Sequence, residues 1–267
     1  MSCPRLSLVL RGFKRLRSGN SVKKPIKSIH LLRFFDNLKP FVESHNVRLY
    51  ITVLSVAFQG LLRVSEYAAN HRHDLSYRTL RLANIRFYPT KSSPSRIEIL
   101  LARSKTNQYG VCKEAVAFEC TCSSNICAFH RLLEYLEHCH SNSRSSDPLF
   151  AFASGAILSK RDVNRLIDKM CDSISLDKRD YSSHSMRSGG ATELYLAGVP
   201  LDLIQRIGRW SPTGTTLQSR YLKPTPIQVR ELVQISIQKN RSSSVRKSRK
   251  QFDRKTTTSS LTYLCGL

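Results

Sequence analysis

Acidic residues are scarce in this sequence, and no hydrophobic run approaches the length of a membrane span. The 267 residues include 19 Asp and Glu against 43 Lys and Arg, so the formal net charge is +24 at pH 7. The two terminal segments are rich in Lys and Arg, but basic residues also outnumber acidic ones between them. A basic body with basic ends favours a polyanionic partner, most often nucleic acid.

Several short motifs are also absent. The basic N-terminus has no long apolar segment followed by a cleavage site, so we predict no secretory signal. The sequence contains neither a P-loop nor an HExxH stretch, the patterns typical of nucleotide-triphosphate binding and of one class of zinc protease.

Cysteine is not scarce, since eight are present, and in a chain without a secretory signal they favour thiols over a disulfide framework. One cluster contains Cys120, Cys122, Cys127 and Cys139, with His130, His138 and His140 nearby. Thiolates and imidazoles are zinc ligands, but the stretch "CTCSSNIC" lacks the paired CxxC spacing of a strong zinc motif. We therefore assign no metal and leave open whether this cluster binds zinc.

Hydrophobic periodicity predicts a mainly α protein with a small three-stranded antiparallel sheet, an α+β fold. The second predicted helix has Leu54, Phe58, Leu61 and Leu62 on its buried side. Ser159 and Asp162 form an expected capping box. The predicted strands lie within 79–89, 95–102 and 111–119. The predicted helices are 29–41, 47–68, 127–139, 159–171, 184–197, one opened by Pro200, and 227–237.

The stretch "HSMRSGG", residues 184–190, carries the first chemical signal. A spacing of three residues places His184 and Arg187 on one face of a helix. Both lie near the expected helix start, where backbone N–H groups and the helix dipole favour an anion such as phosphate. A capped helix with a surface arginine is the alternative explanation.

Three further stretches complete a pattern. "GLLRVSEY" contains Arg63 and Glu66, "RSKTNQYG" contains Lys105 between two predicted strands, and "GRWSPTGTTLQSRYLKP" contains Trp210 and Tyr221. With the His184–Arg187 pair, these motifs stand in the order of the tyrosine recombinase (integrase) family, which the chain resembles from about residue 47 to 223. The "HSMRSGGAT" section looks most like recombinases of eukaryotic Crypton and DIRS-type mobile elements.

The resemblance implies a DNA recombination, integration or transposition enzyme that forms a 3′-phosphotyrosine intermediate on Tyr221, without metal or other cofactor. Arg63 and Arg187 would hold the phosphate, because arginine binds phosphate bidentately and stays charged. His184 would accept the Tyr221 proton or bind the phosphate, and Lys105 would protonate the departing 5′ oxygen. Trp210 would donate its indole N–H to a phosphate oxygen. Glu66 would orient Arg63 or the helix that carries it.

Two departures from the family pattern affect this interpretation. Trp210 lies further from the tyrosine than usual, so Arg209 is an alternative occupant of its position. Few residues precede the catalytic motifs, where the family has a separate DNA-clamping domain. The domains expected are a flexible basic arm at 1–28, a remnant helix of a reduced DNA-binding region at 29–46, a catalytic domain at 47–238 and a disordered basic tail at 239–267.

Double-stranded DNA is the expected partner, and the resemblance implies a homo-oligomer, a tetramer on DNA. The alternatives are a DNA-binding relic of a mobile element that lacks strand exchange, and an enzyme similar to type IB topoisomerases. The basic tails and the resemblance to eukaryotic elements favour a nuclear location.

Overall fold

The computed structural model describes residues 23–74, 79–101, 114–120, 125–140, 143–224 and 228. The chain divides into two units. The first comprises Met1–Tyr195 and Val199–Lys223, and the second comprises Leu196–Gly198 and Pro224–Leu267. Nearly all described residues belong to the first unit. Within the described part, no helix is both long and apolar enough to cross a bilayer.

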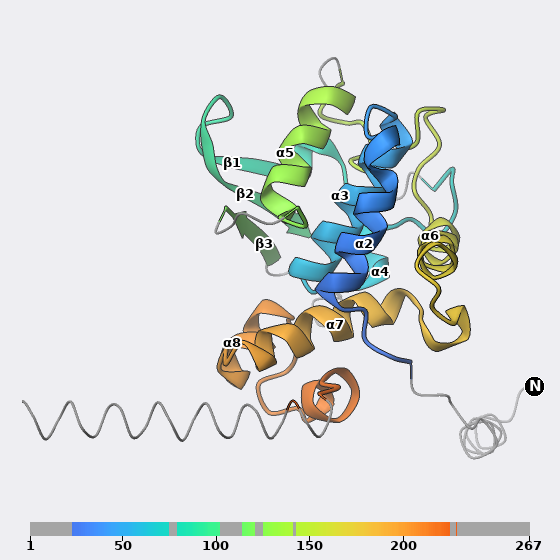
Figure 1. Ribbon diagram of the computed structural model, residues 1–267. Coiled ribbons are helices and arrows are strands. Elements are labelled where there is room, and N and C mark those ends of the chain that lie inside the picture. Colours follow the sequence, from blue (N-terminus) through green and yellow to red (C-terminus); the bar gives the residue numbers. More distant parts are fainter. Residues whose placement is uncertain are drawn as a thin grey trace, which may run out of the picture. The chain divides into compact units, whose positions relative to one another are not determined.

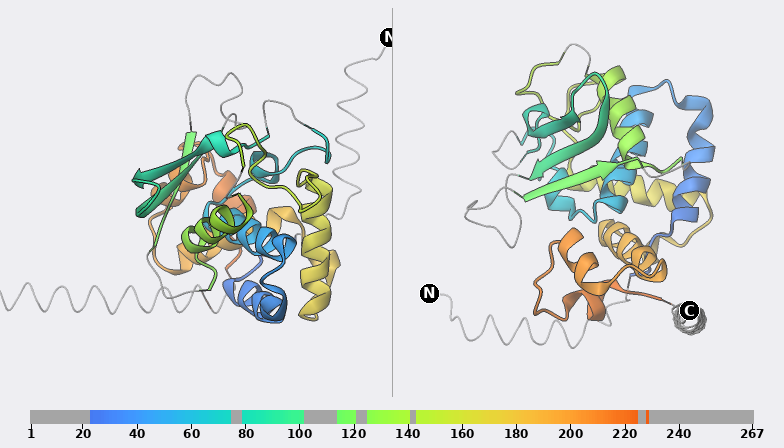
Figure 2. Two further views of the ribbon diagram at one scale, coloured as in Figure 1. Left: turned by 90° about the horizontal axis from the view of Figure 1, so that it is seen from above. Right: turned by 90° about the vertical axis from the view of Figure 1, so that its left-hand side faces the viewer.

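The first unit is mainly helical, with one small sheet beside the helices (Figures 1 and 2). Helix α3 packs against α5, and α2 packs against α3 and α6. Apolar side chains of all four helices belong to one core. The described α-helices are α2 (Ser28–Leu38), α3 (His45–Gln59), α4 (Val64–Tyr67), α5 (Ala128–Cys139), α6 (Lys160–Ser173), α7 (Ser183–Leu196) and α8 (Leu201–Ile207). The 3₁₀ and π segments are η1 (Lys39–Phe41), η2 (Leu82–Asn84), η3 (Lys178–Asp180) and η4 (Leu217–Tyr221).

The sheet contains β1 (Ile85–Pro89), β2 (Pro94–Leu101) and β3 (Glu114–Glu119), in the order β1-β2-β3. Both pairings are antiparallel; Ile99 of β2 lies opposite Ile85 of β1 and Val116 of β3. Buried residues alternate with more exposed ones along β2 and β3, as expected for strands with one face on a core. The predicted small antiparallel sheet and the fold class are confirmed, although the first strand is shorter because Leu82–Asn84 forms η2.

The predicted continuous helix over 47–68 is wrong, because the chain turns between α3 and α4. Helix α3 ends at Gln59, and Leu61 adopts a left-handed φ of +47° before α4 begins at Val64. Leu61 and Leu62 are nevertheless buried, as predicted. An apolar pattern does not distinguish a buried turn from a buried helix, so periodicity alone does not reveal this break. Arg63 consequently lies at the N-cap of α4 instead of within a helix.

Other predicted helices are confirmed at their expected positions, including α5 and α7. At the start of α6, the Ser159 hydroxyl accepts a hydrogen bond from the Asp162 N–H, and the Asp162 carboxylate accepts one from the Ser159 N–H. This is the predicted capping box. The helix predicted over 227–237 lies outside the described residues except for Gln228.

The two glycines that follow Arg187 and Ser188 allow α7 to lie against two other segments. A Cβ on Gly189 would come within 1.7 Å of the Ile26 carbonyl oxygen, and one on Gly190 within 2.2 Å of the Phe58 carbonyl oxygen. Both obstacles are backbone atoms, which cannot swing away as a side chain can. The glycines therefore set how closely the helix bearing Arg187 approaches the end of α3.

We expect Gly190→Ala to destabilise the fold, because the added methyl group must displace the end of α3 or α7 itself. Overpacking of a buried contact costs about 1–3 kcal/mol, and a clash with backbone belongs at the upper end of that range. The measurement is the free energy of unfolding in urea. Gly214→Ala serves as the control, since Gly214 also lacks a positive φ and the added methyl group there would lie no closer than 3.3 Å to its nearest neighbour, the Ser211 Cβ. An equal loss in both variants would show that close approach is not the cause.

Candidate active site

A buried carboxylate, Glu66, joins two arginines from distant parts of the chain. Its Oε1 lies 2.6 Å from Arg63 Nη1, and its Oε2 lies 2.8 Å from Arg209 Nη2. The Arg63 backbone N–H also donates to Oε2, at 2.8 Å. Burial by itself would raise the pKa of Glu66, but the charge of Arg209, the Arg63 N–H bond and the charges of Arg63 and Arg187 outweigh it and lower the pKa. Glu66 is therefore a fixed negative charge that orients both guanidiniums.

Arg187 is completely buried next to this ion-pair network. Its Nη1 donates to the Leu61 carbonyl and its Nη2 to the Gly208 carbonyl. Burial lowers the pKa of Arg187 to about 9, with the neighbouring guanidiniums acting in the same direction and Glu66 opposing them. The side chain remains positively charged at neutral pH, held by carbonyl dipoles instead of a carboxylate.

Two aromatic rings cover the Arg187 guanidinium. Its Cζ lies 4.1 Å from the centroid of the Trp210 ring and 5.4 Å from that of the Tyr221 ring. The two rings meet edge to face, with centroids 4.9 Å apart. The structure thus brings Arg63, Arg187, Trp210 and Tyr221 into one place, as their order in the sequence predicted.

Tyr221 is the last residue of the π-helical segment η4, and α7 holds its backbone. Its carbonyl accepts hydrogen bonds from Ser188 Oγ at 2.5 Å and from Thr192 Oγ1 at 3.3 Å. A π-helical turn takes up an extra residue relative to an α-helical one. The long spacing between Trp210 and Tyr221 is accommodated by η4 and by the turn at Ser211–Gly214, where the Gly214 N–H bonds to the Ser211 carbonyl.

Three N–H donors in this cluster have no hydrogen-bond partner among the described residues. They are Arg187 Nε, Arg209 Nε and Trp210 Nε1, all buried. Buried donors without a partner are rare and call for an explanation. Three guanidiniums, those of Arg63, Arg187 and Arg209, outnumber the two carboxylates beside them, Glu66 and the more distant Glu114, so this part of the described chain carries an excess of positive charge. Both features fit a site for an anion.

His184 and Arg187 differ in exposure, which the helix-face argument did not predict. Both lie in the first turns of α7, but His184 is exposed whereas Arg187 is buried. Partial burial of the imidazole lowers the pKa of His184 below its usual 6.5, and the charge of Arg187 lowers it further. The imidazole is consequently neutral at pH 7 and able to accept a proton.

The prediction for Lys105 falls on residues 102–113, outside the described residues. The two residues that flank this segment pair with each other, Leu101 of β2 with Glu114 of β3. Glu114 in turn lies near the cluster, with its Oε2 4.0 Å from Arg209 Nε.

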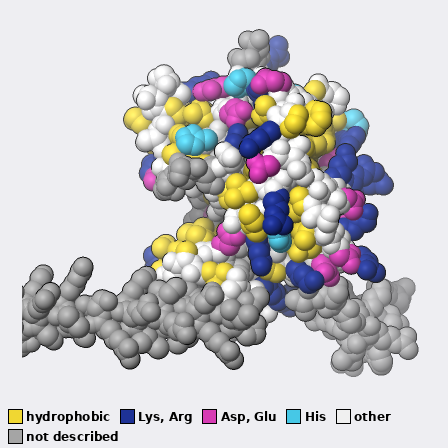
Figure 3. All heavy atoms as spheres, viewed as in Figure 1, with side chains coloured by type: hydrophobic (Ala, Val, Ile, Leu, Met, Phe, Trp, Pro, Cys, Tyr) yellow, Lys and Arg dark blue, Asp and Glu magenta, His cyan; other side chains and the backbone are white. Residues whose placement is uncertain are grey.

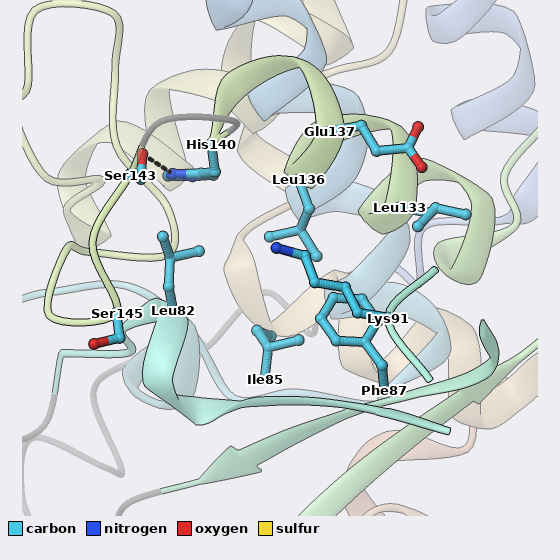
Figure 4. Close-up of a pocket in the computed structure, with 10 residues that line it drawn as sticks. All are labelled: Leu82, Ile85, Phe87, Lys91, Leu133, Leu136, Glu137, His140, Ser143 and Ser145. Carbon is cyan, nitrogen blue, oxygen red and sulfur yellow. Dashed lines mark hydrogen bonds between the residues drawn. The ribbon is translucent and has the colours of Figure 1, made fainter. Parts of the chain in front are cut away.

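Two hollows differ in their relation to the cluster. An open hollow of about 590 Å³ is lined by Arg209 and Trp210 on one side and by Glu114 and Ala115 of β3 on the other. A second pocket, of about 310 Å³, lies between β1 and α5, with Phe87 and Leu136 among its lining residues (Figure 4). None of the predicted catalytic residues that the structure describes lines this second pocket, whereas the open hollow borders the candidate site through Arg209 and Trp210.

Sequence reasoning missed part of this arrangement. The sequence offers Arg209 only as an alternative to Trp210, whereas in the structure both residues belong to the cluster. The contacts of Ser188 and Thr192 with the Tyr221 carbonyl were not foreseen. No spacing rule links residue 66 to residue 209, or residue 188 to residue 221. A sequence signal was present only for Ser188 and Thr192, which follow Arg187 on the same helix.

We expect Glu66→Gln to destabilise the protein at neutral pH by about 3 kcal/mol, because removing one partner leaves buried guanidiniums uncompensated. The pKa of Glu66 is lower in the folded protein than its ordinary value of about 4.5. The stabilisation by its ionised carboxylate is therefore fully present above about pH 4.5 and is lost as the pH falls through the folded-state pKa. Urea unfolding at several pH values should show wild type and variant converging in acid. Glu137→Gln, on an exposed turn of α5, is the control, and a pH-independent gap would contradict the assignment.

The comparisons with known proteins concern the family and the fold. The family model described as "Phage integrase family" matches residues 27–226. Among solved structures, the XerA recombinase has a TM-score of 0.55 at 16% identity, covering 82% of this chain and 65% of XerA. The XerH site-specific recombinase, in a post-cleavage complex with a palindromic difH substrate, has a TM-score of 0.54 at 17% identity, covering 82% of this chain and 54% of XerH.

No curated protein matches the sequence. The chain spans less than two thirds of the length of both recombinases, and identities this low establish the fold alone. That fold is the one typical of tyrosine recombinase catalytic domains, mostly helical with a three-stranded antiparallel sheet. Because the family model covers most of the chain, we conclude that this protein belongs to the phage integrase family, the tyrosine recombinases.

Proposed function

We propose that the chain is a site-specific recombinase that breaks and rejoins double-stranded DNA through a covalent bond to Tyr221. The observation that carries this proposal is the excess of buried positive charge around the Tyr221 ring, with N–H donors that have no acceptor among the described residues. A DNA phosphate would supply both the missing negative charge and the missing acceptors. Membership of the phage integrase family supports the same reaction class.

In this mechanism the Tyr221 oxygen attacks the phosphorus of a phosphodiester and displaces the 5′ oxygen. The products are a 3′-phosphotyrosine and a free 5′ hydroxyl, and the reverse attack by a 5′ hydroxyl rejoins the strand. Negative charge spreads over the non-bridging oxygens in the transition state. Arg63 and Arg187 would stabilise it, with Glu66 holding Arg63 in a fixed orientation.

Two proton transfers complete the reaction. His184, neutral at pH 7, would accept the Tyr221 proton, and Lys105 would give a proton to the departing 5′ oxygen. Trp210 would donate its buried Nε1–H to a non-bridging oxygen. No step in this scheme needs metal or nucleotide chemistry, because the phosphotyrosine conserves the bond energy needed for rejoining.

Arg187 is completely covered in this form of the protein. For a phosphate to reach it, the Trp210 and Tyr221 rings must separate from the guanidinium. Both rings lie on the chain between α8 and the end of η4, so the proposed movement concerns this one segment. DNA binding would drive the movement by replacing two ring contacts with phosphate hydrogen bonds to the same guanidinium.

Surface charge supports DNA as the partner. Arg161, Arg165 and Lys169 recur every four residues on the exposed side of α6, and Lys and Arg side chains gather over this part of the surface in Figure 3. XerH was solved bound to its difH DNA substrate. Phosphate contacts make such binding weaken with added salt.

A second candidate function is DNA binding without cleavage, as in a relic of a mobile element. The complete burial of Arg187, with both terminal nitrogens donating to backbone carbonyls, favours it. The two candidates differ in whether a covalent adduct forms, so one experiment separates them.

We expect wild-type protein to form a covalent adduct with a nicked suicide duplex, and Tyr221→Phe to form none. The phenol oxygen is the only heavy atom removed, and without it no phosphotyrosine can form. Duplexes would be drawn from DNA flanking the gene, and adducts detected on a denaturing gel.

Tyr195→Phe is the matched control, because Tyr195 is half-buried and packs on the same apolar cluster as Tyr221. Its adduct should form normally. If wild type binds a duplex with salt-sensitive affinity but forms no adduct on any flanking sequence, the non-cleaving function replaces the recombinase.

If neutral His184 accepts the tyrosine proton, adduct formation should slow as the pH falls below about 6.5, where the imidazole becomes protonated. Because the pKa of His184 is lowered, the rate of adduct formation should decline at pH values below 6.5. Initial rates measured between pH 5 and 8 should show the decline in wild type and not in a slower His184→Gln variant. The same decline in both proteins would rule out His184 as the group responsible.

A further inference from the structure

A group of three possible metal ligands lies where the sheet meets helix α5. Cys120 comes directly after β3, Cys127 is the residue just before α5, and His130 is in the first turn of that helix. One thiol is buried, since Cys127 is 3% exposed, whereas Cys120 and His130 lie at the surface. None of the three belongs to the Glu66 cluster.

The ligand atoms are already close to the spacing that zinc requires. Cys120 Sγ lies 3.9 Å from His130 Nδ1, and the Sγ atoms of Cys120 and Cys127 and a ring nitrogen of His130 all lie within 4.8 Å of one another. Tetrahedral zinc, with Zn–S near 2.3 Å and Zn–N near 2.0–2.1 Å, holds its ligand atoms roughly 3.6–3.8 Å apart. Closing the group around an ion needs movements of at most about 1 Å, within the reach of the two exposed side chains.

We propose that Cys120, Cys127 and His130 bind a zinc ion. Two thiolates and an imidazole match the ligand preference of zinc, whereas magnesium and calcium select oxygen ligands. Cys127 is fixed by burial at the N-terminal end of α5, where the helix dipole favours the negative charge of a metal-bound thiolate. These three residues leave one position of the tetrahedron for a fourth ligand.

The ion would fasten the end of β3 to the start of α5. The other end of β3 is Glu114, whose carboxylate faces Arg209, so the strand runs between the metal group and the arginine cluster. Six residues of strand span about 20 Å, and the zinc is therefore too far from Tyr221 to act in the proposed chemistry. Its role would be to hold the sheet in place, and the proposal is independent of the proposed function.

The structure separates Cys139 from this group, although the two lie in one sequence cluster. Helix α5 has 12 residues, which places Cys139 about 18 Å along the helix from Cys127. Cys139 and His138 are thus natural controls, being a thiol and an imidazole at the opposite end of the same helix. The His138 ring instead hydrogen-bonds to the Glu134 carbonyl.

The test uses the full chain, purified under reducing conditions and dialysed against micromolar zinc. Bound zinc is counted by mass spectrometry, and affinity is measured by competition with a chromophoric chelator. We expect about one zinc per wild-type chain. Removing a residue that only hydrogen-bonds to a metal ligand weakens metal binding roughly 10- to 100-fold. Cys120→Ser and His130→Ala each remove a ligand, so each should weaken zinc binding by more than this. Cys139→Ser and His138→Ala should match wild type.

Cobalt substitution gives a readout that does not depend on zinc counting. Cobalt bound by wild type should show thiolate-to-metal charge-transfer absorption, and Cys120→Ser should lose much of it. Cys120 and His130 are exposed, so replacing them should leave the fold intact, which circular dichroism checks. Wild type that holds neither metal, equal losses in the control variants, or a Cys120–Cys127 disulfide in the freshly isolated chain would each overturn the proposal.

Discussion

The structure of the candidate site depends on one constraint, the burial of positive charge that is balanced mainly by one buried carboxylate, Glu66. Glu66 pairs with Arg63 and Arg209, whereas Arg187 is held by backbone carbonyls from the loop after α3 and from the end of α8. Each of these loops contains a non-glycine residue with positive φ, Leu61 and Arg209. Such conformations cost about 1–3 kcal/mol each and persist only where the surroundings enforce them. Here Arg187 donates hydrogen bonds to the carbonyls of Leu61 and Gly208, which helps to hold both loops in these conformations.

The same constraint makes the site a meeting point of segments far apart in sequence. The turn before α4, the first turns of α7, the residues after α8 and the segment η4 all contribute to it. Gly189 and Gly190 allow α7 to lie close to neighbouring backbone, and Gly190 in particular allows it to lie against the end of α3. The arrangement is electrostatically incomplete, because three buried donors lack acceptors within the described parts of the chain. The geometry therefore favours an anionic ligand over a purely structural role for the arginines.

One difference from the family pattern, the spacing between Trp210 and Tyr221, is accommodated within a single segment of the chain. The longer spacing between Trp210 and Tyr221 is taken up by a turn and a π-helical segment, so the aromatic rings still meet over Arg187. The small sheet borders the site through the start of β3, where Glu114 faces Arg209. The other end of that strand carries the group of two cysteines and a histidine, and the proposed zinc would add to the contact between β3 and α5.

Local features of the sequence determined most of the secondary structure, because helix and strand periods and capping pairs such as Ser159 and Asp162 act over a few residues. The motifs, taken with the family resemblance, also predicted that Arg63, Arg187, Trp210 and Tyr221 lie together. Only the tertiary structure decided the break at Leu61, the burial of Arg187 and the pairing of Glu66 with Arg209. A buried turn and a buried helix have the same apolar pattern, and an ion pair between residues 143 positions apart leaves no local trace. These features arise from packing between segments, which periodicity does not encode.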